Sequence, residues 1–141
     1  MCRTQRWRDR LFRTQLNGRF GVASPVPRMA GGVQMLGSSG TVTTLAGVNL
    51  ALPRYIRAMV DGSMLTFDQI ELVSRHLAGL DIAGRAASPC VGRERADLVL
   101  SGCAILDAIC ATWPVGRLRV ADRGVREGIL FDLMHGHRRP E

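Results

Sequence analysis

The spacing of apolar and polar positions changes several times along the chain, and each change predicts a different element. Residues 33–36 form a short apolar run that stops at the glycine- and serine-rich residues 37–40, as a strand followed by a tight turn does. Residues 41–50 then place apolar side chains on one side of a helix, and Pro53 marks its end because the residue before a proline is pushed out of the helical region. The sequence therefore predicts a strand, a glycine-rich turn and a helix.

The next residues predict a small hairpin and a capped helix. Residues 59–65 contain an Asp-Gly pair between apolar residues, which indicates a two-residue hairpin turn. Thr66 and Gln69 match a capping box, in which Thr66 precedes the helix and Gln69 occupies its third position. Apolar residues at helical spacing extend this helix to about Gly79.

A long apolar helix is expected after a loop. Small residues and a proline predict the loop over residues 84–92, and the helix begins near residues 93–95 and ends at about Thr112. It is apolar nearly all round, so we expect it to be buried on more than one side, with Gly102 permitting a close contact.

The last elements predict the fold class. Residues 117–121 alternate as a strand does, and a second turn leads into a helix over residues 125–134, with Glu127 in its first turn where the helix dipole favours a carboxylate. The order β-α-hairpin-α-α-β-α predicts an α/β fold whose two main strands are parallel and joined by a right-handed crossover.

The basic charge of the chain is concentrated at its ends. Residues 1–32 hold seven arginines against one aspartate, residues 135–141 form a short tail, and residues 33–134 hold ten arginines and ten carboxylates. We therefore expect a disordered Arg-rich extension over residues 1–32, a neutral domain over 33–134 and a tail, with any binding of nucleic acid or another polyanion confined to the extension.

Several classes of protein are excluded by what the sequence lacks. It contains no lysine, which excludes a Walker lysine and a Schiff base, and its four cysteines have no zinc spacing. Cys103 and Cys110 are expected to be buried free thiols, as in a reduced cytoplasmic protein. No apolar run is long enough to span a membrane.

The strongest local signal is the glycine- and hydroxyl-rich segment over residues 37–44. Such a turn lets backbone N–H groups approach an anion at a helix start, so phosphate is the natural ligand. The same residues are equally explained as helix caps. The candidate phosphate-binding residues are Ser39, Gly40, Thr41, Thr43 and Thr44.

The other ionisable residues offer little chemistry. We assign Asp61 to the hairpin turn, Asp68 and Glu71 to a solvated helix face, and Asp122 to a helix cap. His76 and the pair of histidines at 135 and 137 are expected at the surface rather than in a metal site. We therefore name no catalytic residue and no metal ligand.

Two motifs in order carry a family resemblance. Residues 40–46 (GTVTTLA) and 122–130 (DRGVREGIL), with Arg95-Ala96-Asp97 between them, are similar to the exopolyphosphatase and guanosine pentaphosphate phosphohydrolase (Ppx/GppA) family. The resemblance runs from about Val33 to Met134 and implies the second half of the second lobe of an actin-like (ribonuclease H-like) fold.

The resemblance also implies an activity. The family removes terminal phosphate from polyphosphate or guanosine pentaphosphate, usually with Mg²⁺, and the GTVTT loop would lie near phosphate. Arg95 and Glu127 match the family pattern and are expected to serve the architecture as a pair.

The departures from the family pattern limit this reading. The Asp-x-Gly-Ser-Asn-Ser loop and catalytic glutamate of the first lobe have no counterpart here, nor does the Asp-x-Gly-Gly-Gly-Ser loop of the second. We therefore expect a truncated gene product that holds phosphate but is inactive alone and binds no metal by itself. We also expect it to oligomerise or to be marginally stable, because its sheet has an unpaired edge. The alternative is a non-catalytic basic protein that acts through its Arg-rich arm.

Overall fold

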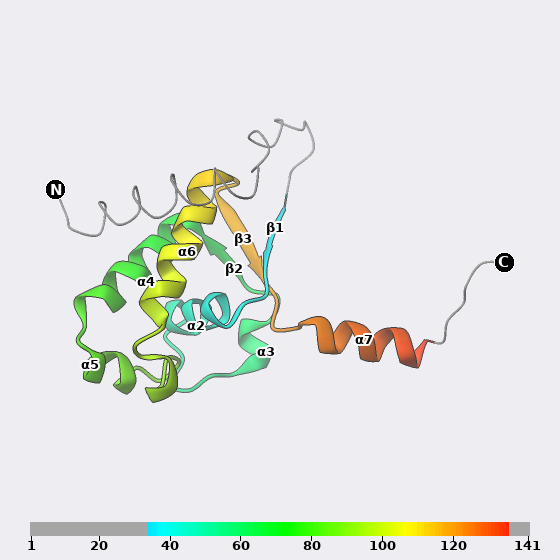
Figure 1. Ribbon diagram of the computed structural model, residues 1–141, viewed down its shortest axis with the longest axis horizontal. Helices are drawn as coiled ribbons and strands as arrows, with labels where there is room; N and C mark the ends of the chain where they lie inside the picture. The colour runs from blue at the N-terminus through cyan, green and yellow to red at the C-terminus, as the bar shows by residue number, and fades with distance from the viewer. Residues whose placement is uncertain (1–33, 136–141) are drawn as a thin grey trace.

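Three short strands form one mixed sheet in the computed structural model, which describes residues 34–135. The strands β1 (Met35–Gly37), β2 (Met64–Thr66) and β3 (Arg117–Val120) lie in the order β1-β3-β2 (Figure 1). β1 is parallel to the central strand β3, and β2 is antiparallel to it. The predicted parallel pairing of the two main strands is confirmed.

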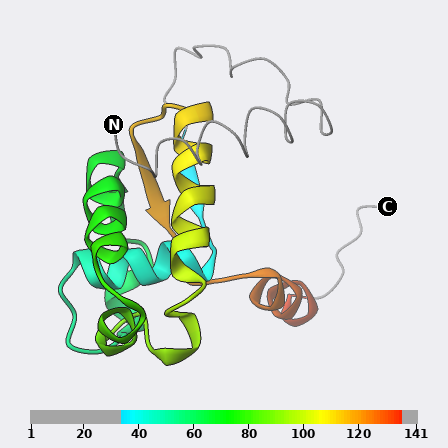
Figure 2. The ribbon, with the colours of Figure 1, turned by 60° about the vertical axis from the view of Figure 1, so that its left-hand side comes forward.

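Helices cover one face of this sheet. Three of them, α2 (Gly40–Asn49), α4 (Phe67–Gly79) and α6 (Val99–Thr112), pack against one another, and Figure 2 shows α4 (green) and α6 (yellow) flanking β3 (orange). Leu65, Leu118 and Val120 point from the strands into this core and are at most 1% exposed. The opposite face exposes Leu36, Met64, Arg117 and Arg119.

Local sequence signals explain the elements that were predicted. Ser39 caps α2, and the capping box of Thr66 and Gln69 starts α4 with both of its hydrogen bonds formed. Gly102 allows a close approach between α6 and Thr41 at the start of α2, because a Cβ atom at Gly102 would lie 2.2 Å from the Thr41 hydroxyl oxygen. The predictions for α2, α4, β3 and the close contact at Gly102 are confirmed.

The predicted hairpin at residues 59–65 is wrong. The residues before the Asp-Gly turn form a short helix, α3 (Arg57–Val60), and the strand after it, β2, pairs with β3 instead of with a local partner. The Asp-Gly turn itself is present, and the Gly62 amide donates to the Val120 carbonyl at 2.8 Å. Because β3 lies far from β2 along the chain, the local turn signal could not identify it as the partner of β2.

The loop predicted over residues 84–92 contains part of a helix. α5 (Ile82–Ala87) is capped by Asp81, whose carboxylate accepts a hydrogen bond from the Gly84 amide at 2.7 Å. Arg85 is buried and donates to three backbone carbonyls, those of Leu77, Leu80 and Ala96. These bonds fold the segment back onto the end of α4.

The long helix is also shorter than predicted. Residues Arg93–Arg95 form a 3-10 turn, η1, and α6 begins only at Val99. The predicted burial on more than one side is only partly confirmed, since Ala108, opposite Val99 on the helix, is buried, whereas Ile105 is 54% exposed. An apolar outer face, rather than complete burial, accounts for the apolar composition of this segment.

The last helix, α7 (Val125–Met134), matches its prediction but extends away from the body (Figure 1). None of its residues is buried.

The predictions for the Arg-rich extension over residues 1–32 and for the end of the tail, including His137, concern residues outside those that the structure describes. Within residues 34–135, no helix is long and apolar enough to cross a membrane.

Candidate functional site

A polar pocket lies where the two parallel strands end. The carboxyl ends of β1 and β3 meet at one edge of the sheet, which is where α/β folds place their ligands. The pocket has a volume of about 300 Å³. Its lining is formed by Ser38, Gly40, Thr43, Tyr55, Cys90, Val91, Arg95 and Asp122.

The first turn of α2 borders this pocket through Gly40 and Thr43 and has two unpaired amides. The Val42 amide donates to the Ser39 hydroxyl at 3.3 Å, and the Thr43 amide donates to the Ser39 carbonyl at 3.1 Å. The first amides of a helix have no preceding turn whose carbonyls could accept from them. The amides of Gly40 and Thr41 accordingly have no acceptor within residues 34–135. These two N–H groups and the positive end of the helix dipole favour an anion.

The hydroxyl groups of Ser39, Thr43 and Thr44 already form hydrogen bonds within the protein. Thr43 lines the pocket, but its hydroxyl donates to the Gly40 carbonyl at 3.1 Å. Thr44 is only 1% exposed, and its hydroxyl accepts from Arg95. Ser39 serves as the helix cap. Of the five residues proposed from the sequence, Gly40 and Thr43 therefore line the pocket, and whether any of the five contacts phosphate stays a prediction.

Arg95 is the cation of the pocket. One guanidinium nitrogen of Arg95, Nη1, donates to the Gly40 carbonyl at 3.2 Å and to the Thr44 hydroxyl at 3.0 Å. A Cβ atom at Gly40 would lie 3.3 Å from this nitrogen, so glycine lets the guanidinium lie close to the helix start. No carboxylate of the described part of the chain forms an ion pair with Arg95. Its charge therefore remains available to an anionic ligand.

The expected pair of Arg95 and Glu127 is wrong. Glu127 forms an ion pair with Arg57 at 3.4 Å, and its other oxygen accepts from the Gly124 amide at 2.8 Å, which makes Glu127 the cap of α7. That hydrogen bond from Gly124 is the main reason why the pKa of Glu127 lies below its ordinary value.

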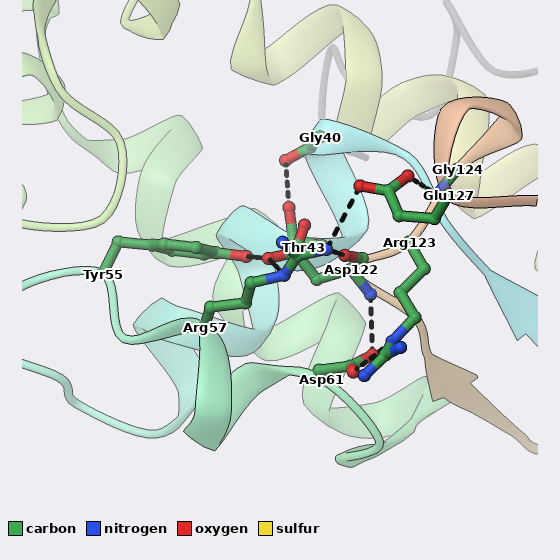
Figure 3. Close-up of polar contacts among 9 residues, drawn as sticks. All are labelled: Gly40, Thr43, Tyr55, Arg57, Asp61, Asp122, Arg123, Gly124 and Glu127. Carbon is green, nitrogen blue, oxygen red and sulfur yellow. Dashed lines mark hydrogen bonds and ion pairs between the residues drawn. The ribbon is translucent and has the colours of Figure 1, made fainter. Parts of the chain in front are cut away.

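A second wall of the pocket is formed by Tyr55 and Asp122 (Figure 3). The Tyr55 hydroxyl donates to Asp122 Oδ2 at 2.8 Å, and Arg57 Nε lies 3.2 Å from the same oxygen. Burial, followed by this hydrogen bond, raises the pKa of Tyr55, so its hydroxyl stays protonated and acts as a donor. Asp122 is therefore not the helix cap that the sequence suggested.

Asp61 binds the segment that contains Asp122 and Arg123, and lies below it in the view of Figure 3. Its carboxylate accepts from the Asp122 amide at 3.0 Å and from Arg123 Nε at 3.1 Å. The bond from the Asp122 amide is the largest cause of the lowered pKa of Asp61. This aspartate is a structural link between the turn after α3 and the residues after β3, beyond the turn role that was predicted.

The remaining cysteines and histidines of residues 34–135 form no activated nucleophile and no metal site. Burial raises the pKa of the Cys90 thiol, which lowers its fraction of reactive thiolate. Cys103 is a buried free thiol as predicted, whereas Cys110 is only half-buried. His76 is exposed, and His135 stacks on Phe131 at the end of α7.

The described residues do not fit a magnesium ion by themselves. Residues 34–135 contain no group of three histidines, cysteines or carboxylates that would hold a metal. The carboxylate at the pocket, Asp122, already has one oxygen bonded to Tyr55 and Arg57. A magnesium ion would therefore need ligands from elsewhere, such as substrate phosphates and waters.

Sequence reasoning located the helix start but missed the side chains that face it. Arg95, Tyr55 and Asp122 come from three separate segments, and their meeting depends on tertiary packing. Arg95 had been singled out as part of a motif, but the sequence gave it a wrong partner and did not indicate its contact with Gly40.

Comparisons with known proteins agree on one family. The sequence matches the model of the Ppx/GppA phosphatase family over residues 19–137, so the match begins upstream of Val33. A Haemophilus influenzae protein named "Putative exopolyphosphatase" is 30% identical over 109 residues, which are 75% of this chain and 31% of that protein.

Solved structures of the family are similar in fold. A crystal structure of the Aquifex aeolicus Ppx/GppA family member has a TM-score of 0.71 at 28% identity, covering 83% of this chain and 37% of that one. The type II variant of the Aquifex aeolicus phosphatase has a TM-score of 0.69 at 29% identity, covering 78% and 35%. The chain thus spans about a third of the length of these relatives.

Proposed function

Because the chain belongs to the Ppx/GppA phosphatase family, we propose that its pocket holds a phosphate group of a phosphoanhydride substrate, either polyphosphate or guanosine pentaphosphate. The observation that carries this proposal is that the guanidinium of Arg95 lies at the helix start that holds the two unbonded amides of Gly40 and Thr41. No carboxylate of residues 34–135 neutralises this guanidinium. Amides at a helix start and an arginine together form a recurring phosphate site.

We propose that residues 1–141 bind such a substrate without appreciable turnover. Hydrolysis needs a water positioned in line with the leaving group, and cationic charge on the phosphate oxygens. The carboxylates near the pocket are engaged elsewhere: Asp61 and Glu127 in backbone hydrogen bonds, and Asp122 with Tyr55 and Arg57. The magnesium implied by the family resemblance would have to be held largely outside the described residues.

A cytoplasmic setting suits this function. Buried free thiols at Cys90 and Cys103 are consistent with a reducing compartment.

The binding claim is tested by calorimetry with inorganic tripolyphosphate. Arg95→Ala is expected to weaken binding by about tenfold or more, because a charged hydrogen bond of about 1.5–3 kcal/mol is lost. Arg93→Ala is the matched control, since this exposed arginine of the same turn η1 does not line the pocket. Equal weakening by the two variants would leave only a general charge effect and contradict the proposal.

Two further arms separate the alternatives. Deletion of residues 1–32 is expected to leave tripolyphosphate binding in place; if it abolishes binding with a steep salt dependence, the Arg-rich arm is the functional element. Phosphate release from polyphosphate in magnesium buffer is expected to stay at background. Release that Asp122→Asn abolishes would show that this chain is an active hydrolase.

A further inference from the structure

The last helix, α7, leaves an apolar surface uncovered. Six large apolar side chains of this ten-residue helix are 55–81% exposed, and none of its residues is buried within the described part of the chain. They are Val125, Ile129, Leu130, Phe131, Leu133 and Met134. So many exposed apolar side chains on one helix are typical of a surface that contacts another molecule.

The connection before α7 holds the helix away from the sheet of its own chain. Each of its four residues, 121–124, forms a hydrogen bond, and Asp61 accepts two of these bonds (Figure 3). At the helix start, Glu127 forms an ion pair with Arg57. A turn of α7 back onto the sheet would break these bonds, so its apolar surface is directed away from its own chain.

The open face of the sheet, opposite α2, α4 and α6, offers a second uncovered surface. Leu36, Arg119 and Met64 lie side by side across the three strands on this face, and Leu36 and Met64 are 64% and 43% exposed. Arg117 lies on the same face, and neither arginine forms an ion pair within residues 34–135. An α/β sheet is normally covered by helices on both faces, so this face lacks a helix.

Charge and size fit α7 to the open sheet face. Ile129, Asp132 and Leu133 are neighbours on one side of the helix, because residues three and four apart lie next to each other. This side combines apolar side chains with a carboxylate, whereas the sheet face combines apolar side chains with arginines, and its strands contain no carboxylate. A helix of ten residues is about 15 Å long, close to the width of about 14 Å that three strands span.

We propose that two copies of this chain form a symmetric dimer by exchanging α7, so that each helix packs on the open sheet face of the other copy. Ile129 and Leu133 then contact the apolar part of that face, and Asp132 pairs with Arg119 of the partner subunit. Because each chain supplies one helix and one sheet face, the contact is made twice and the assembly closes at two copies. Each contact therefore has to bury only half of the about 1,200–2,000 Å² that stable interfaces bury.

The dimer does not depend on the function proposed for the pocket. No residue of α7 and none of the four residues named on the open sheet face lines the pocket. Failure of one proposal therefore leaves the other standing.

Sedimentation of the full chain over a concentration series tests the dimer. The unmodified chain is expected to sediment as a dimer, and Leu133→Ala is expected to weaken dimerisation about tenfold or more, because an apolar contact is lost twice. Leu72→Ala is the matched control, since this leucine of α4 is 68% exposed, against 67% for Leu133, and lies on neither surface. It is expected to leave dimerisation unchanged.

An exchange of charges identifies a second copy as the occupant of the sheet face. Arg119→Asp and Asp132→Arg are each expected to weaken dimerisation about tenfold or more, because like charges then face each other in both contacts. An equimolar mixture of the two variants is expected to regain the original affinity, since one contact of the mixed dimer has the original charges and the other has them exchanged. Arg93→Asp is the charge-matched control at an exposed position of η1 and is expected to have no effect.

Each outcome supports or overturns the exchange of α7. A full chain that stays monomeric overturns it and leaves the sheet face to another occupant, such as residues 1–32 of the same chain. A dimer that Leu133→Ala and both charge variants leave intact uses another surface and also overturns it. Single variants that dissociate and do not recover in the mixture overturn the pairing of Asp132 with Arg119. If a charge variant loses its helical circular dichroism signal, the comparison of Leu133→Ala with Leu72→Ala still decides.

Discussion

The contact between Gly102 of α6 and Thr41 of α2 yields the sharpest stability prediction. A Cβ atom at Gly102 would lie 2.2 Å from the Thr41 hydroxyl oxygen, 2.9 Å from its Cγ2 and 3.1 Å from its Cβ. Thr41 carries two heavy atoms on its Cβ, so every staggered rotamer keeps at least one of them in these two positions, and Gly102→Ala must push the two helices apart.

The magnitude follows from two opposing effects. Overpacking a core contact costs about 1–3 kcal/mol, and replacing a glycine inside a helix by alanine gains up to about 1 kcal/mol. Gly79→Ala is the matched control, because no heavy atom lies within 4 Å of a Cβ atom at this position of α4. We expect Gly102→Ala to be less stable than Gly79→Ala by about 1–3 kcal/mol, which corresponds to about 4–12 °C in melting temperature.

Thermal unfolding followed by circular dichroism measures this difference, and a second variant shows its cause. Thr41→Ala removes the two nearest atoms, so the double variant with Gly102→Ala should regain at least half of the lost stability. Because Thr41 lies in the first turn of α2, which borders the pocket, Gly102→Ala should also weaken tripolyphosphate binding more than Gly79→Ala does. Equal melting temperatures of the two glycine variants, or no recovery in the double variant, would refute the proposed clash.

Two further predictions concern buried and surface charges. Arg85→Met leaves three backbone carbonyls without their buried donor, so urea unfolding should show a loss of about 2–4 kcal/mol, with Arg85→Lys losing less; an unchanged urea midpoint would contradict this. The pKa of Asp61 in the folded chain lies below its ordinary value of 3.8, so its stabilisation is present above that value and is lost as the pH falls through the lower folded pKa. Asp61→Asn should therefore flatten the fall of melting temperature below about pH 4, and parallel profiles of the two proteins would refute the role given to this carboxylate.

Signals contained within a few residues predicted the local structure well. The capping box at Thr66 and the serine cap of α2 place hydrogen-bond donors and acceptors within one helical turn, so the sequence alone identifies them. The strand over residues 117–120 was recognisable for the same reason, since its alternation directly reflects one buried and one exposed face.

Features that depend on distant partners were missed. The strand β2 was assigned to a local hairpin because its true partner, β3, lies about fifty residues further on. The helix α5 was hidden by glycine and proline signals, although Asp81 with Gly84 three residues later was a readable cap.

In the site too, local features were predicted and contacts between distant residues were missed. The glycine-rich start of α2 was identified from sequence, but the three-residue motif Arg95-Ala96-Asp97 gave no hint that the Arg95 guanidinium reaches Gly40 across the fold. Asp122 was classed as a helix cap because it precedes α7, although Glu127, which caps this helix, lies only three residues after Gly124. The bonds of Asp122 to Tyr55 and Arg57 depend on tertiary packing.

The location of a bound phosphate chain tests the central claim most directly. Isotope-labelled chain titrated with inorganic tripolyphosphate in magnesium-free buffer should show the largest changes in backbone amide resonances at Gly40 and Thr41, with a parallel change at the Arg95 side chain. Changes confined to the Arg-rich residues 1–32, with the signals of Gly40 and Thr41 unmoved at saturation, would contradict it.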